Sequence, residues 1–150
     1  MDRAKRRSRS DAPTPIKVFE AISNLDSFKI LGLLYKNKKE KTYSTLEIGK
    51  TLKLTRKQTY SRIQNFLRAG LVIRCKGEVK LTTFGRVVMD SLQKVNNAIQ
   101  IYSKLRAIDA VSLSKQAAKE EIEQLIDSLV QDEQIKDILK KFEPTGFFSS

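Results

Sequence analysis

The fold of this protein is decided by residues 44–85, which read STLEIGKTLKLTRKQTYSRIQNFLRAGLVIRCKGEVKLTTFG. Apolar residues recur at helical spacing after Ser44 and again after Thr55, and a hydroxyl side chain at either position can cap a helix. Beyond Gly70, apolar and polar residues alternate on both sides of Gly77, which is typical of two short strands. The stretch therefore predicts a helix, a tight turn, a second helix and a hairpin.

Helical patterns flank this stretch on both sides. Upstream, a helix is expected after residues 23–26, with Phe28, Leu31, Leu34 and Tyr35 at helical spacing, and residues 42–44 are expected to be extended. Downstream, Thr82 or Thr83 begins a long helix with coiled-coil-like apolar spacing, followed by a helical pattern from Ser114 and a short last helix capped by Asp132. The predicted fold class is mainly α with a small β-hairpin, an α+β arrangement.

The charge of the chain is strongly basic and unevenly distributed. The 150 residues include 29 Lys and Arg against 17 Asp and Glu, a net charge of +12. The net charge is +4 in residues 1–17, +9 in residues 18–90 and −1 in residues 91–150. A domain with this excess is expected to bind a polyanion. The opening segment lacks hydrophobic periodicity and contains prolines, so we expect a disordered basic arm; a solvated tail, nonspecific phosphate contact and a targeting address stay open.

Several classes of function are excluded by composition. The chain has no histidine and one cysteine, which rules out a His-based catalytic triad, a His/Cys zinc site and an intrachain disulfide. It also lacks a glycine-rich phosphate loop and clustered carboxylates beside a nucleophile. We therefore expect no enzyme, no cofactor and no metal. The apolar runs are far shorter than the ~20 residues of a membrane-spanning helix, and a cytoplasmic, nucleoid-associated location is expected.

Taken in order, these motifs resemble a winged helix-turn-helix domain. Residues 46–54 correspond to the scaffold helix with its turn, residues 55–69 to the recognition helix and residues 74–80 to the wing. The Ala-Gly-Leu-Val junction at 69–72 and the Leu-Thr-Thr-Phe-Gly sequence at 81–85 are similar to those of small prokaryotic, especially archaeal, transcription regulators. The resemblance covers about residues 23–90 and implies a DNA-binding protein.

The expected domain organisation follows from the charge and the motifs. Residues 1–17 form the disordered basic arm, residues 18–86 the winged helix-turn-helix domain, residues 87–143 a helical dimerisation region and residues 144–150 a C-terminal tail. The apolar seam expected to join two chains consists of Val88, Leu92, Val95, Ile99 and Tyr102. The competing interpretation is that the later helices of the same chain fold back over this seam.

The candidate DNA contacts lie on two helix starts, the recognition helix and the wing. Ser44, Thr45 and Thr55 mark helix N-termini, which favour phosphates. The side chains expected to read base edges in the major groove are Arg56, Lys57, Gln58, Arg62 and Asn65, with Ser61 allowing close approach. If Leu71, Ile73 and Cys75 face the core, the wing presents three outward cations: Arg74, Lys76 and Lys80.

The sequence thus favours a sequence-specific, homodimeric regulator that binds double-stranded DNA, with any small-molecule effector unknown. A winged-helix interaction or scaffold module in a larger nucleic-acid-associated assembly is the alternative, because a fold does not fix a function. The cations concentrated in residues 18–90 favour the regulator. RNA binding is disfavoured because the hairpin lacks aromatic residues on which bases stack.

Overall fold

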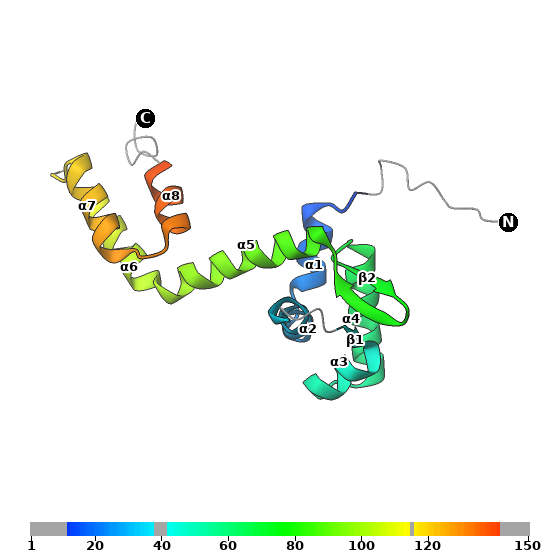
Figure 1. Ribbon diagram of the computed structural model, residues 1–150. Coiled ribbons are helices and arrows are strands. Elements are labelled where there is room, and N and C mark those ends of the chain that lie inside the picture. The colour runs from blue at the N-terminus through cyan, green and yellow to red at the C-terminus, as the bar shows by residue number, and fades with distance from the viewer. Residues whose placement is uncertain (1–11, 38–41, 115, 142–150) are drawn as a thin grey trace. The chain divides into compact units, whose positions relative to one another are not determined.

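The computed structural model describes residues 12–37, 42–114 and 116–141 (Figure 1). Most of the expected basic arm and the whole C-terminal tail lie outside these residues. The chain divides into two compact units, Met1–Asp90 and Ser91–Ser150. This division lies four residues beyond the expected boundary between 86 and 87, within the same helix. Each unit is described by itself below.

The first unit is a winged helix-turn-helix domain preceded by one extra helix. Its elements in chain order are α1 (Pro15–Ile22), α2 (Leu25–Lys36), β1 (Tyr43–Ser44), α3 (Thr45–Leu52), α4 (Arg56–Arg68), β2 (Val72–Cys75), β3 (Glu78–Leu81) and the start of α5 (Thr83–Gln100). The three strands form an antiparallel sheet in the order β1-β3-β2, so the hairpin strand β3 lies in the middle. The observed elements confirm the predicted fold class.

The core of the first unit lies where α2, α3, α4 and the sheet meet. Its fully buried apolar side chains are Ile30 and Leu31 of α2, Ile48 of α3, Ile63 and Phe66 of α4, and Leu71, Val72 and Val79 around the hairpin. Phe66 is the largest of them, and truncating such a side chain to alanine typically costs about 3–5 kcal/mol. The orientation of α4 is therefore fixed by burial of one stripe.

The Leu-Thr-Thr-Phe-Gly sequence forms a clasp between the end of α4 and the start of α5. The Thr82 Oγ1 hydroxyl donates to the carbonyl of Gly70 at 2.6 Å and accepts from the amide of Gly85 at 2.8 Å. The Thr82 amide donates to the carbonyl of Leu71. At Gly85, any Cβ would collide with that same Leu71 carbonyl. This close approach explains why a threonine and a glycine stand three residues apart.

The N-terminal segment differs from the expectation at its last residues. Residues 1–17 were expected to be disordered, yet α1 begins at Pro15, with Thr14 as its N-cap accepting from the Lys17 amide at 3.3 Å. Proline opposes a helix only in the interior; at the first helical position its missing N–H costs nothing. Val18, Ala21 and Ile22 are buried, which anchors α1 to the unit.

The inner face of β2 also differs from the expectation. Ile73, predicted to face the core, is 50% exposed, and Cys75 is exposed, whereas Val72 is buried. Leu71 is buried as well, but it belongs to the turn after Gly70, where its amide donates to the Phe66 carbonyl. The strand begins one residue later, so the alternation of faces is shifted by one.

The second unit has its own small core. It contains the end of α5 together with α6 (Tyr102–Ser112), α7 (Lys119–Leu129) and α8 (Glu133–Lys141). The buried residues are Ile108, Ile122, Ile126, Val130 and Ile135. Ala98, Ile101 and Leu105 pack against this cluster. The last helices of the chain therefore do fold back, and they pack against the end of α5, the junction at Ile101 and the first turn of α6.

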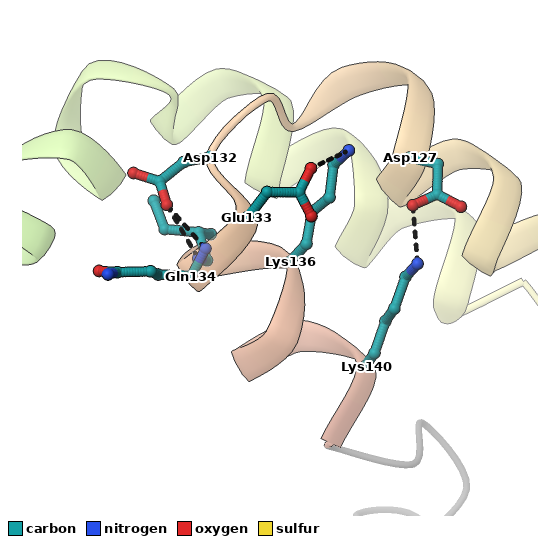
Figure 2. Close-up of polar contacts among 7 residues, drawn as sticks. Asp127, Asp132, Glu133, Gln134, Lys136 and Lys140 are labelled. Atoms are coloured by element: carbon teal, nitrogen blue, oxygen red, sulfur yellow. Dashed lines mark hydrogen bonds and ion pairs between the residues drawn. The ribbon is translucent and has the colours of Figure 1, made fainter.

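Asp132 begins α8 as predicted, and it also ties α8 to α5. Its Oδ1 accepts from the amides of Gln134 and Ile135 at 2.9 and 3.2 Å (Figure 2). Its Oδ2 accepts from the side-chain amide of Asn97 on α5 at 3.1 Å. The pKa of Asp132 is lowered below its ordinary value. The main cause is the hydrogen bond from the Ile135 amide, and the next is the hydrogen bond from the Asn97 side chain. A hydrogen bond from Lys140 at 2.7 Å similarly lowers the pKa of Asp127 on α7 (Figure 2).

The long helix expected through Tyr102 is interrupted. Ile101 leaves helical geometry with φ −108° and ψ 21°, so Tyr102 begins α6 instead of continuing α5. The predicted seam is therefore shared between two helices. Val95, Ile99 and Tyr102 are 55%, 63% and 61% exposed, and Val88 and Leu92 are half-buried.

Candidate nucleic-acid interface

Helix α4 has one buried stripe and one basic exposed stripe. Thr59, Ile63 and Phe66 are buried, as predicted. The helix carries four basic residues, Arg56, Lys57, Arg62 and Arg68, and no acidic residue. A helix with this division of faces is suited to lie in a major groove with its basic stripe toward the DNA.

The N-terminus of α4 is closed by an uncharged capping box. Thr55 Oγ1 accepts from the Gln58 amide at 3.2 Å, and Gln58 Oε1 accepts from the Thr55 amide at 3.0 Å. The predicted reading residue Gln58 thus already uses its oxygen within the helix. Its Nε2 group remains as a donor toward a base or a phosphate.

The N-terminus of α3 is closed in the same way but with an acid. Ser44 Oγ accepts from the Glu47 amide at 3.2 Å, and Glu47 Oε2 accepts from the Ser44 amide at 2.9 Å. A carboxylate in the first turn satisfies the helix dipole and repels a phosphate. Of the two predicted phosphate positions, the one at Thr55 is therefore electrostatically favourable and the one at Ser44 and Thr45 is opposed by Glu47.

The predicted reading residues do not all share one exposed surface. Arg56, Lys57 and Ser61 are exposed in the first half of α4. Arg62 is half-buried, and its Nε atom is buried with no hydrogen-bond partner among the described atoms. Asn65 is half-buried too and lines a cleft with Lys17 and Glu20 of α1. Arg56, Lys57, Gln58 and Ser61 are thus the exposed members of the set.

The wing cations point in different directions. Val72 pairs with Leu81, Ile73 with Lys80 and Arg74 with Val79, so Arg74 and Lys80 lie on opposite faces of the hairpin. The expectation that they share an outward face is wrong for the same reason as at Ile73. The Arg74 guanidinium lies over the ring of Tyr60 on α4, 5.7 Å from its centroid, which is cation–π range.

The tip of the wing is a two-residue turn formed by Lys76 and Gly77. Both residues have positive φ, 50° and 79°. A hairpin turn of this kind favours Asn-Gly, because asparagine tolerates the left-handed conformation better than lysine does. Lys76 is exposed at this tip.

Three residues near the recognition helix lie outside the predicted contact set. Lys50 and Lys53 of the α3 end and Tyr60 of α4 line, together with Arg56 and Lys57, a groove of about 620 Å³ between the two helices. A signal was present in the sequence, because residues 50–57 contain four basic residues and no acidic one. Lys53 adopts a left-handed C-cap with φ 56°, which the sequence pattern did not indicate.

Within residues 12–37, 42–114 and 116–141, no group of three or more Cys, Asp and Glu side chains is placed to hold a metal ion. None of the described helices combines the length and the apolar character needed to cross a membrane.

Comparisons with known proteins show a likeness at the level of structure. No protein-family model matches the chain, and no curated protein matches it. The chain is similar to the crystal structure of a MarR-family protein of Mycobacterium tuberculosis, with 22% sequence identity, a TM-score of 0.43, and coverage of 84% of this chain and 82% of that chain. This likeness assigns no activity to the present chain.

Proposed function

We propose that this protein is a sequence-specific, double-stranded DNA-binding transcription regulator that acts as a homodimer. Helix α4 lies in the major groove, and the wing at residues 74–80 contacts the backbone or the minor groove. The observation that carries the proposal is the exposed stripe of α4, which is basic, free of acids and begins at an uncharged capping box.

Direct base contacts are assigned to the first half of α4. Arg56, Lys57 and Ser61 are exposed there, and Gln58 keeps one donor. Arg62 and Asn65 stay in the predicted set, but their partial burial means that DNA binding has to reorient them. Thr55 marks the favoured phosphate position, and Lys76 and Lys80 supply further phosphate contacts.

The direct test is selection of bound fragments from a random duplex pool, followed by sequencing. An enriched palindrome is expected, because a symmetric dimer places two recognition helices on related half-sites about one helical turn apart. Arg56→Ala and Lys57→Ala should each lower the ratio of specific to nonspecific affinity, by about 1–3 kcal/mol where a base contact is lost. Lys29→Gln on exposed α2 removes the same charge elsewhere and should leave that ratio unchanged. A pool without enrichment would instead favour the interaction or scaffold alternative.

The homodimer is supported by an apolar face that the second unit leaves uncovered. Its core packs on Ala98, Ile101 and Leu105, whereas Val95, Ile99 and Tyr102 remain more than half exposed. Although the later helices fold back, they do not cover these three residues of the predicted seam. An exposed apolar stripe of this kind is typical of an association surface.

Ile99→Glu tests the homodimer, because a carboxylate in an apolar seam is costly to bury. The variant should sediment as a folded monomer and bind paired half-sites without cooperativity. Gln93→Glu adds the same charge to an exposed position of α5 outside the seam and should remain dimeric. A wild-type chain that already sediments as a monomer would overturn the homodimer.

A further inference from the structure

The groove between α3 and α4 has an apolar interior. Leu46 and Leu54 line it from α3 and the following turn, and Tyr60 lines it from α4. Leu46 is 46% exposed and Tyr60 55% exposed, although both are large apolar side chains on a well-packed unit. Its floor lies at the close crossing of the helices, where a Cβ on Gly49 would come within 3.0 Å of the Thr59 hydroxyl. The groove is therefore a lined concavity and not a gap in packing.

The rim of the groove is cationic. Lys50, Lys53, Arg56 and Lys57 surround the apolar interior, and none of the groove's described lining residues is acidic. All four cations are exposed. The same rim includes the N-terminus of α4, whose capping box carries no charge. The Gln58 amide there is bonded to Thr55, whereas the amides of Arg56 and Lys57 have no acceptor within the helix. The charges of the rim and the dipole of helix α4 thus both favour an anion at the rim of the groove.

The size and chemistry of the groove indicate a small molecule with two parts. A volume of about 620 Å³ falls within the ~300–1,000 Å³ range of small-molecule sites. Leu46, Leu54 and Tyr60 suit an apolar or aromatic body. Four cations exceed what one carboxylate neutralises, and lysine ammonium groups bind phosphate well as point charges.

We propose that the α3–α4 groove binds a phosphate-bearing amphipathic small molecule. The apolar body lies against Leu46 and Tyr60, and the phosphate lies among Lys50, Lys53 and the first turn of α4. Arg56 and Lys57 belong to both this site and the proposed DNA-contacting set, so a bound ligand competes with DNA. That competition rests on the proposed function, whereas binding of the ligand itself does not.

The left-handed backbone of Lys53 is consistent with a role for its charge. A residue at φ 56° after a helix is usually glycine or asparagine, because other side chains are strained there. Lysine at this position places its ammonium group on the rim at a cost in stability. Lys53→Asn removes the charge and relaxes the backbone, so it separates ligand binding from folding.

The test uses isothermal titration of the full chain, without DNA, with phenyl phosphate as the probe. Inorganic phosphate and phenol serve as its two halves. Phenyl phosphate is expected to bind at least tenfold more tightly than either half. Lys53→Asn should weaken phenyl phosphate severalfold while its melting temperature stays equal or rises. Leu46→Ala should weaken phenyl phosphate but leave inorganic phosphate unchanged.

The charge control is Lys29→Gln on exposed α2, which is expected to bind phenyl phosphate like the wild type. Equal binding of phenyl phosphate and inorganic phosphate would overturn the proposal, because charge alone then accounts for the site. Equal binding of phenyl phosphate and phenol would overturn it as well. Because the titration contains no DNA, a failure of ligand binding would not count against the proposed regulator function. Conversely, a failure to enrich DNA fragments in the selection experiment would not count against ligand binding.

Discussion

At the scale of single residues, the backbone carries more information than the side-chain pattern indicates. The only non-glycine residues with positive φ in the described ranges are Lys53 and Lys76. Both are lysines, at positions where glycine or asparagine is less strained. Both belong to the proposed binding surfaces, at the groove and at the wing tip. Local strain of this kind is often retained where a side chain has a function.

Lys76→Asn is expected to stabilise the first unit while weakening DNA binding. Asparagine relieves the left-handed strain, which is worth about 1 kcal/mol, and removes one phosphate contact. Affinity should fall evenly across DNA sequences, as measured by fluorescence anisotropy on specific and random duplexes. Lys80→Asn removes the same charge from an extended strand position and should lower stability instead. A Lys76→Asn chain that melts below the wild type would contradict the strain argument.

Gly85→Ala is expected to destabilise the first unit strongly, by more than the ~1 kcal/mol that glycine and alanine normally differ in a helix. The reason is that the new Cβ collides with the Leu71 carbonyl inside the Thr82 clasp. Gly32→Ala in α2 is the matched control, since its Cβ would meet nothing within 4 Å, and it should stabilise the chain by about 1 kcal/mol. Urea unfolding measures both, and equal effects would refute a steric role for Gly85.

At the scale of elements, the sequence predicts what depends on nearby residues. The starts of α3, α4 and α8 follow from Ser44, Thr55 and Asp132, because each cap binds amides two or three positions away. The inner face of β2 was mispredicted because it depends on where the turn after Gly70 ends and on pairing with β3.

The sequence also did not predict features that depend on how distant residues pack together. Nothing in the local pattern indicates that Arg62 is half-buried, that Arg74 lies over Tyr60, or that α5 ends before Ile101. The candidate site was accordingly predicted as a helix with a basic stripe, but its division into exposed and partly buried members was not. The groove between α3 and α4 was not predicted, because it exists only when the two helices are packed against each other.

Two aspartates of the second unit predict its response to acid. The pKa values of Asp127 and Asp132 are lowered in the folded chain, so each carboxylate stabilises the fold above its ordinary pKa near ~4. That contribution is lost as the pH falls through the lower folded pKa. Stability of this unit should be flat between about pH 5 and 7 and fall below about pH 4.

Asp132→Asn removes the titrating group in this prediction. Asparagine keeps an acceptor for the Gln134 and Ile135 amides but loses the second acceptor, which holds Asn97, and it does not titrate. The variant should therefore be less stable at neutral pH, and its loss of stability in acid should become shallower. The measurement is urea unfolding of the full chain, monitored through the NMR signals of Ile126 and Ile135, because both residues lie in the core of this unit. An unchanged acid profile in the variant would show that Asp132 does not govern it.

At the scale of the whole molecule, the charge distribution predicts a steep salt dependence. A dimer with α4 and the wing on DNA contacts several phosphates per chain, so the log-log slope of affinity against salt should be on the order of −6 or steeper. Deletion of residues 1–12 removes much of the basic arm and should flatten the slope without changing the preferred DNA sequence. A changed consensus site after that deletion would show that the arm reads bases.

The two left-handed lysines also have a consequence for how this sequence evolves. In the genetic code a lysine codon becomes an asparagine codon by a single third-position change, so the less strained residue is one mutational step away at both Lys53 and Lys76. Under selection for stability alone, such steps are readily fixed. In laboratory evolution for thermal tolerance, both positions should drift to asparagine when the natural ligands are dispensable, and should resist that drift when binding determines survival.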